Sequence, residues 1–135
     1  MEKAKKKKTI KLILIIILGI ILLVTTAGIV AVKTIENNLE NLKTAEISAV
    51  DFSKFADGDY LGTYEATPIS VKISITVKDK KVTEINLIEH KNGKGKKAEA
   101  LIPQMIEKQT IKLDTISGAT YSSIVILKAV EDAFK

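Results

Sequence analysis

The most prominent feature of the hydrophobicity pattern is an uninterrupted apolar run near the N-terminus. Residues 12–32 are 21 uncharged positions in succession, mostly Ile, Leu and Val, with a lysine directly before and after them. As an α-helix this run would be about 31 Å long, which matches the hydrocarbon core of a bilayer. It therefore predicts a single uncleaved transmembrane helix. A cleaved signal peptide is the alternative, but its apolar region should span only about 7–15 residues.

After this run, the pattern predicts a helical stalk and then a sheet. Apolar residues at helical spacing indicate a stalk over residues 33–49, and the repeat is too short to indicate a coiled coil. Three strands are predicted at 59–67, 69–78 and 81–90. The second alternates strictly between apolar and polar positions, as half-buried strands do in an antiparallel sheet with one solvated face. The third slips phase once, as across a bulge.

Individual residues refine this pattern. Gly62, inside the first strand, indicates a bulge or a close backbone approach, and Asp79-Lys80 indicates a tight turn between the second and third strands. A helix is predicted at 98–108, where Pro103 indicates either a kink or a start nearer Ile102. A terminal helix follows Thr120, with an apolar stripe opposite the charged residues Lys128, Glu131 and Lys135.

Together these elements predict an α+β fold. We expect a twisted antiparallel sheet packed with two helices and preceded by a single N-terminal transmembrane helix. The predicted organisation is a basic cytoplasmic tail (1–11), a transmembrane anchor (12–32), a juxtamembrane stalk (33–49) and a folded domain (50–135).

The positive charge of the chain is confined to its N-terminal tail. Residues 1–11 contain six lysines and one acid, whereas residues 12–135 contain 15 lysines and 15 acids, so the formal net charge of +5 belongs to the tail. Lysines on this side of the apolar run predict a cytoplasmic N-terminus and an extracytoplasmic domain. A neutral domain without arginine makes nucleic acid an improbable partner. No cysteine and one histidine exclude disulfides, iron–sulfur clusters and multi-histidine metal sites, so an electron carrier here would need an organic cofactor.

A turn before the terminal helix is the strongest candidate for a binding site. Ser117-Gly118-Ala119-Thr120 combines turn residues, two small residues and a hydroxyl at a helix start. Unpaired backbone N–H groups and the helix dipole favour an anion such as a phosphate there. The same residues also suit an ordinary N-cap, and spacing alone leaves both interpretations open. The basic loop 91–97 (KNGKGKK) is similarly either a solvated loop or a flexible flap over a ligand.

Several short motifs between residues 50 and 134 match the pattern of one known family. They are Asp57-Gly58-x-Tyr60-x-Gly62, the hairpin 71–82, Glu89-His90 with Gly93 and Gly95, Gln109, and above all Asp114-x-x-Ser117-Gly118-Ala119-Thr120-x-Ser122-Ser123. In these residues the chain resembles the small FMN-binding domain family, which includes the covalently flavinylated subunit of sodium-pumping NADH:quinone reductase and extracytoplasmic flavoproteins. The last motif resembles the target of a flavin transferase, which moves FMN from FAD onto the final threonine.

The resemblance implies FMN as the cofactor and assigns roles to residues of this chain. Thr120 would carry FMN through a phosphoester, Gly118 and Ala119 would leave room for the phosphate and the transferase, and Ser117 would belong to the same cofactor-binding motif. Asp114 would belong to the recognition motif of the transferase. Tyr121 stands where the family often has Thr, and its ring would lie near the isoalloxazine. Glu89, His90, Gly93 and Gly95 are the remaining candidates for the flavin pocket, although a lone histidine at a strand end is more often a surface residue.

The function implied is that of a membrane-anchored extracytoplasmic electron carrier rather than an independent enzyme. Nothing in the sequence indicates a nucleophile or a general base, so no catalytic residue is predicted. The expected partners are the flavin transferase, electron donors and acceptors in the membrane or outside the cell, and the lipid bilayer. Two other classes stay open: a module that binds flavin or another small ligand without a covalent bond, and a structural or assembly subunit of a membrane redox complex.

Overall fold

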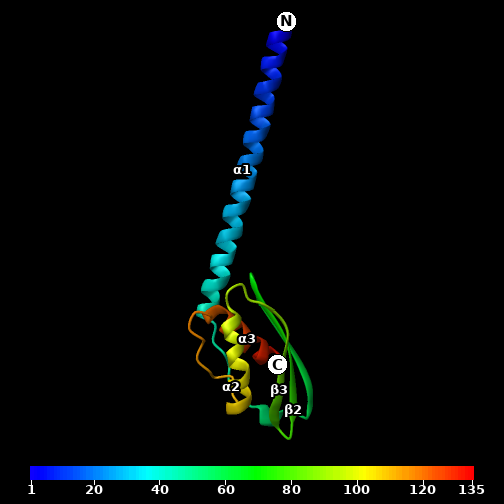
Figure 1. The fold of residues 1–135 in the computed structure, drawn as a ribbon, viewed down its shortest axis with the longest axis vertical. Helices are drawn as coiled ribbons and strands as arrows, with labels where there is room; N and C mark the ends of the chain where they lie inside the picture. Colours follow the sequence, from blue (N-terminus) through cyan, green and yellow to red (C-terminus); the bar gives the residue numbers. More distant parts are fainter. The chain divides into compact units, whose positions relative to one another are not determined.

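The computed structural model describes all residues, 1–135, and divides into two compact units, residues 1–36 and 37–135. Helix α1 (Glu2–Lys43) provides the whole of the first unit and its last turns belong to the second. The second unit contains the sheet and the other helices (Figure 1).

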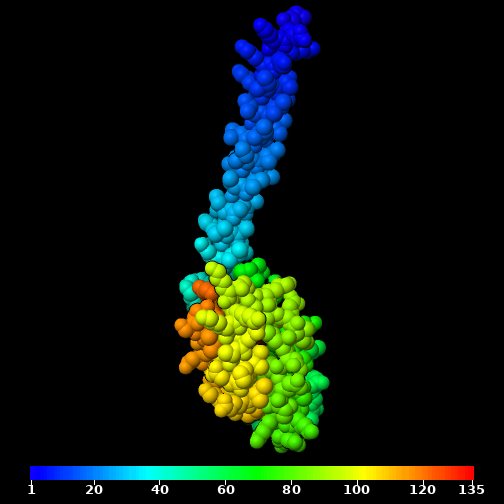
Figure 2. Space-filling model, viewed as in Figure 1, coloured from blue at the N-terminus to red at the C-terminus, as the bar shows by residue number.

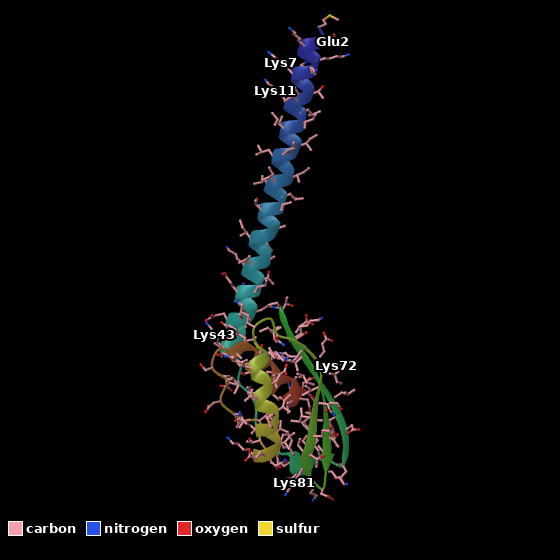
Figure 3. The ribbon with its side chains drawn as sticks, viewed as in Figure 1. Glu2, Lys7, Lys11, Lys43, Lys72 and Lys81 are labelled. Carbon is pink, nitrogen blue, oxygen red and sulfur yellow. The ribbon has the colours of Figure 1, made fainter.

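The first unit is a helix whose apolar side chains have no partners in the chain. The large hydrophobic residues of the predicted anchor are all exposed, for example Leu14 at 59% and Leu23 at 71%. This helix is long and apolar enough to cross a membrane by its length and composition. Figure 3 shows lysine side chains, among them Lys7 and Lys11, projecting from its first turns.

The sheet of the second unit has three antiparallel strands in the order β1 (Gly58–Ala66), β2 (Ile69–Lys78) and β3 (Lys81–Lys91). The alternation in β2 is confirmed, because its apolar residues are buried and the residues between them are exposed or half-buried. Asp79 and Lys80 form the predicted turn, and both have a positive φ, at 51° and 61°. Strand β3 contains two irregularities against β2 where the phase pattern predicted one. The predicted α+β class is correct.

Two helices and a short 3-10 helix cover one face of this sheet. The 3-10 helix η2 (Lys96–Ala100) leads directly into α2 (Leu101–Lys108), so Pro103 lies in the first turn of α2, where a proline is tolerated. Helix α3 (Thr120–Asp132) packs on β1 and β2, and Figure 1 shows α2 and α3 on the same side of the sheet. The core between them includes Ile73, Leu101 and Ile126, each 0% exposed.

Gly62 lets α3 approach β1 closely. A Cβ atom at this position would lie 2.0 Å from the carbonyl oxygen of Ala129 and 2.9 Å from the Cβ of Ala133. The close backbone approach predicted from the sequence is confirmed, and no bulge separates β1 from β2. This contact fixes α3 on the sheet and so determines where its N-terminus lies.

Two of the three charged residues predicted on the polar side of the terminal helix are largely buried, whereas Lys135 lies beyond the end of α3 and its side chain is exposed. Glu131 is only 6% exposed, and Lys128 forms an ion pair with it at 2.8 Å. The ammonium of Lys128 also donates to the carbonyl oxygen of Glu46, in the extended segment that follows α1. Periodicity within α3 could not reveal this segment, which covers the polar stripe from elsewhere in the chain.

Candidate functional site

The candidate site begins with a β-turn directly before α3. The backbone N–H of Ala119 donates to the carbonyl oxygen of Ile116 at 2.9 Å, which closes the turn around Ser117 and Gly118. Gly118 has a φ of +79°, which glycine adopts without the steric cost that a side chain would add. Ser117 and Gly118 are exposed, whereas Ala119 is buried at 5% exposure. The turn therefore rests on the core through Ala119 and presents its tip to solvent.

Ser123 holds this turn against the first turn of α3. Its hydroxyl accepts a hydrogen bond from the backbone N–H of Ile116 at 3.0 Å and donates one to the carbonyl oxygen of Ala119 at 2.8 Å. The side chain is 0% exposed, so neither bond competes with water. One buried hydroxyl thus joins both ends of the turn, and the backbone ahead of Thr120 is preorganised.

The N-terminus of α3 is not capped by a side chain. Its N-cap residue is Ala119, and no side-chain hydrogen bond is made there. The first bond of the helix is donated by the backbone N–H of Ser123 to Ala119 at 2.9 Å, so the N–H groups of the three preceding residues have no helical acceptor. The ordinary N-cap interpretation of this stretch is therefore wrong. Thr120 is the first residue of the helix and is exposed, so its hydroxyl is free to be modified.

A lysine from the end of α1 lies over Tyr121. The ammonium of Lys43 is 5.9 Å from the centre of the Tyr121 ring, within the range of a cation–π interaction. Hydrogen bonding to Glu40, and then to Tyr121, raises the pKa of Lys43 above its ordinary value. The ammonium of Lys43, which also forms an ion pair with Glu40 at 3.1 Å, therefore lies over the ring of the residue that follows Thr120.

The loop that follows β3 packs against α3 through Gly95. Gly95 is buried, and a Cβ atom there would lie 1.9 Å from the hydroxyl oxygen of Ser122. The base of the loop is closed by a contact of 3.0 Å between His90 Nδ1 and Glu99 Oε1. Gly93, with a φ of +55°, lies in the exposed part of the loop between these two contacts. His90, Gly93 and Gly95 thus belong to one segment that contacts the start of α3.

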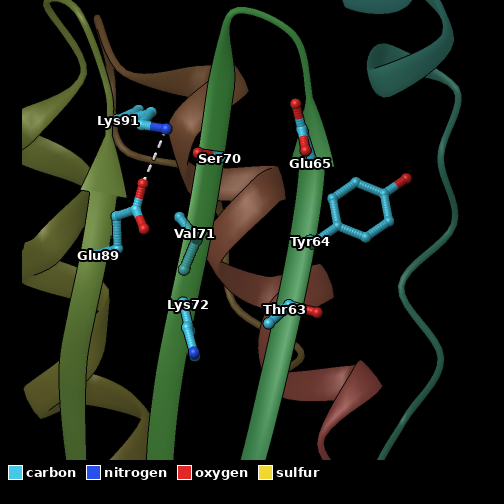
Figure 4. A pocket seen from close by; sticks show the side chains of 8 residues that line it. All are labelled: Thr63, Tyr64, Glu65, Ser70, Val71, Lys72, Glu89 and Lys91. Carbon is cyan, nitrogen blue, oxygen red and sulfur yellow. Dashed lines mark ion pairs between the residues drawn. The ribbon is translucent and has the colours of Figure 1, made fainter.

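The turn before α3, the first turn of α3 and the loop after β3 together form a junction. The other predicted site residues lie apart from this junction or make no contact with it. Asp114 is exposed in the surface segment that leads to the turn, seen in orange beside α2 in Figure 2, and it forms no hydrogen bond or ion pair. Glu89 lies on the opposite face of the sheet from α3. There it pairs with Lys91 at 3.0 Å in a shallow groove of about 390 Å³, which Figure 4 shows in front of the strands with α3 behind them. The structure therefore does not bring Glu89 together with Thr120.

Comparison with known families agrees with this geometry. Residues 66–135 match the family described as the FMN-binding domain, and this range contains the turn, the loop after β3 and all of α3. The chain belongs to the FMN-binding domain family. FMN is accordingly its cofactor, and the protein binds flavin. No curated protein and no solved structure matches the chain.

The matched range limits which motifs the family accounts for. It begins at Ala66, the last residue of β1, so the motif from Asp57 to Gly62 lies outside it and its part in the resemblance stays a prediction. The junction itself suits the phosphate of FMN. It offers an exposed hydroxyl and uncapped N–H groups directly after a turn formed by Ser117 and Gly118.

Sequence reasoning missed Glu99 and Lys43, and it predicted no role for Ser123, although this serine is part of the motif that carries the resemblance. Ser123 and Glu99 act through contacts with residues several positions away, and Lys43 comes from a helix predicted to be only a spacer. Only Ser123 had a signal in the sequence, since a serine in the first turn of a helix often bonds to the carbonyl four residues earlier. Gln109 belongs to the resemblance but had no predicted role. Its side-chain amide pairs with the backbone N–H and carbonyl of Val82, at 2.9 and 2.8 Å, and so closes the edge of β3.

Proposed function

We propose that this FMN-binding protein is a membrane-anchored electron carrier with FMN attached covalently to Thr120. The observation that carries the proposal is an exposed threonine hydroxyl at the first residue of an uncapped helix. A side chain committed to capping would be turned toward the backbone, whereas this hydroxyl is accessible to a modifying enzyme. The phosphodiester formed on it would keep one negative charge, which the free N–H groups and the helix dipole stabilise.

The attachment is a phosphoryl transfer from FAD, catalysed by a separate flavin transferase. The hydroxyl oxygen of Thr120 forms a bond to the flavin-side phosphorus of FAD, the pyrophosphate P–O bond breaks, and AMP leaves. The hydroxyl proton passes to a base of the transferase. Gly118 and Ala119 assist by their small size, and Asp114, exposed ahead of the turn, is available to the transferase as a recognition residue.

The anchor and the charge distribution support an extracytoplasmic location for the domain. The apolar part of α1 exposes its side chains all round, which suits a lipid environment and not water. The six lysines before it keep the N-terminus in the cytoplasm by the positive-inside rule. A cofactor on the outer side of the membrane would be lost by diffusion unless it were bonded to the protein. The partners would then be electron donors and acceptors in the membrane or outside the cell.

In-gel flavin fluorescence tests the proposal. The full chain is produced together with a flavin transferase and separated under denaturing conditions, next to the variants Thr120→Ala and Thr115→Ala. Thr115 is the matched control, because it is an exposed threonine in the same segment. We expect a fluorescent band for the wild type and for Thr115→Ala, and none for Thr120→Ala. Fluorescence that persists in Thr120→Ala would overturn the assignment of the residue. Flavin that is released on denaturation would indicate a non-covalent module.

A further inference from the structure

Two buried polar atoms next to the proposed flavin site have no hydrogen-bond partner. They are Nε2 of His90 and the hydroxyl oxygen of Ser122. The His90 side chain is 3% exposed and Ser122 is 2% exposed. Buried polar groups are almost always hydrogen-bonded, because leaving one unpaired costs its lost hydration. These two atoms therefore indicate a ligand that supplies their missing hydrogen bonds.

The contact with Glu99 determines what His90 offers to such a ligand. An ionised carboxylate can only accept hydrogen bonds, so Nδ1 carries the proton that is shared with Glu99 at 3.0 Å. In the neutral ring this leaves a lone pair on Nε2, which makes that atom an acceptor. The hydroxyl of Ser122 supplies a donor. His90 thus offers an acceptor and Ser122 a donor.

The loop between β3 and η2 covers Ser122, and its hydrogen bonds are internal: the N–H of Gly95 donates to the carbonyl oxygen of Asn92 at 2.7 Å, and the Asn92 side chain donates to that of His90 at 3.2 Å. Gly95 rests directly on the Ser122 hydroxyl, with no room for a Cβ atom. Residues 92–95 lie outside helices and strands, and Lys94, Lys96 and Lys97 are exposed and form no ion pair. Gly93 has a left-handed backbone, with a φ of +55°, and no side chain that restricts its rotation. Lifting this loop would uncover Ser122, which lies two residues after Thr120, about 3 Å along the helix axis.

We infer that His90 and Ser122 form a binding site for the pyrimidine edge of the flavin ring, which the loop 91–97 opens to admit. This edge carries an N3–H donor flanked by two carbonyl acceptors, so N3–H would donate to His90 Nε2 and one carbonyl would accept from Ser122. The inference rests on the proposed function, because FMN on Thr120 brings the ring to this place. In this arrangement the ring binds at His90 and Ser122, and the phosphate binds at the N-terminus of α3.

The single histidine of the chain makes a direct test available. The protein is labelled with nitrogen-15 in histidine, and the two ring nitrogens of His90 are observed by NMR before and after flavinylation. We expect the Nε2 signal to shift on loading, because it gains a hydrogen bond, while Nδ1 keeps its proton. If both signals are the same in the unmodified and loaded protein, the site is not used and the inference is overturned.

Binding of free flavin separates this inference from the covalent attachment. The unmodified full chain is titrated with FMN and with an FMN analogue methylated at N3, which lacks the donor. Loss of one hydrogen bond should weaken binding about 5-fold for the analogue, and similarly for Ser122→Ala with FMN. Ser74→Ala, on the opposite face of the sheet, should bind as the wild type does. Equal affinity for FMN and the analogue, in a protein whose gel band is fluorescent, would overturn this inference and leave the attachment to Thr120 intact.

Discussion

Replacing Ser123 by alanine should destabilise the protein far more than the same change at Ser122. The two serines are neighbours in α3, and both are buried, at 0% and 2% exposure. Ser123 makes two side-chain hydrogen bonds that hold the turn before Thr120, whereas the Ser122 hydroxyl makes none. The pair therefore separates the effect of the hydrogen bonds from the effect of removing a buried oxygen atom.

The expected magnitude follows from the partners that each variant leaves behind. In Ser123→Ala the N–H of Ile116 loses its acceptor in a half-buried place, and the carbonyl of Ala119 keeps only its bond from the Ser123 backbone N–H. At about 1 kcal/mol for each bond, the free energy of unfolding should fall by about 2 kcal/mol. Ser122→Ala removes an unpaired hydroxyl and should change the free energy of unfolding by less than about 0.5 kcal/mol.

Urea denaturation of the full chain in detergent micelles, followed by circular dichroism, measures both variants. Hydrogen exchange at the Ile116 amide adds a local readout, and we expect faster exchange in Ser123→Ala than in Ser122→Ala. Flavinylation of Ser123→Ala should also be slower, since the turn presented to the transferase is less ordered. Equal losses of stability in the two variants, with unchanged exchange at Ile116, would refute the role given to this hydroxyl.

Three further predictions concern the helix packing, a buried ion pair and the N-terminal tail. Gly62→Ala should lower the free energy of unfolding by about 1–3 kcal/mol, because its Cβ would lie 2.0 Å from the carbonyl oxygen of Ala129. An unchanged midpoint of urea denaturation would contradict the close packing. Burial raises the pKa of Glu131, but the hydrogen bond and charge of Lys128 outweigh it and hold the pKa below its usual 4.5. This carboxylate therefore stabilises the protein above about pH 4.5, and its contribution is lost as the pH falls through the lowered pKa. In Glu131→Gln the melting temperature should consequently depend less on pH in the acid range. Replacing the six lysines of residues 1–11 by glutamate should weaken the preference for a cytoplasmic N-terminus, which labelling of a cysteine added at the C-terminus would detect against the cysteine-free background.

Much of the fold was predictable because its signals are local. The bounds of β2 were predicted correctly, since strict alternation is the pattern of a strand with one buried face. The close approach at Gly62 was also predictable, because a glycine inside a strand often marks a place where another backbone comes near. What periodicity could not provide is the contact of distant segments. The burial of Glu131 depends on the segment after α1, and the second irregularity in β3 depends on its register with β2.

The candidate site was predictable at its centre and not at its edges. The turn residues from Ser117 to Thr120 follow from the chemistry of glycine and of helix starts, and the structure joins them in one turn. The absence of a side-chain cap could not be deduced, because the sequence suits an N-cap equally well. The contacts of Lys43 and of Glu99 cross 78 and nine positions of the chain, and no local pattern indicates them.

The intact mass of the purified protein, matured with a flavin transferase, shows whether FMN is bonded to Thr120. We expect a mass increase equal to one FMN less one water, located by peptide mapping to the peptide that contains Thr120, and absent in Thr120→Ala. Thr120→Ser should restore it at least in part, since serine also offers a hydroxyl. A matured protein with the mass of the bare polypeptide, or with the added mass on another residue, would show that Thr120 does not carry FMN.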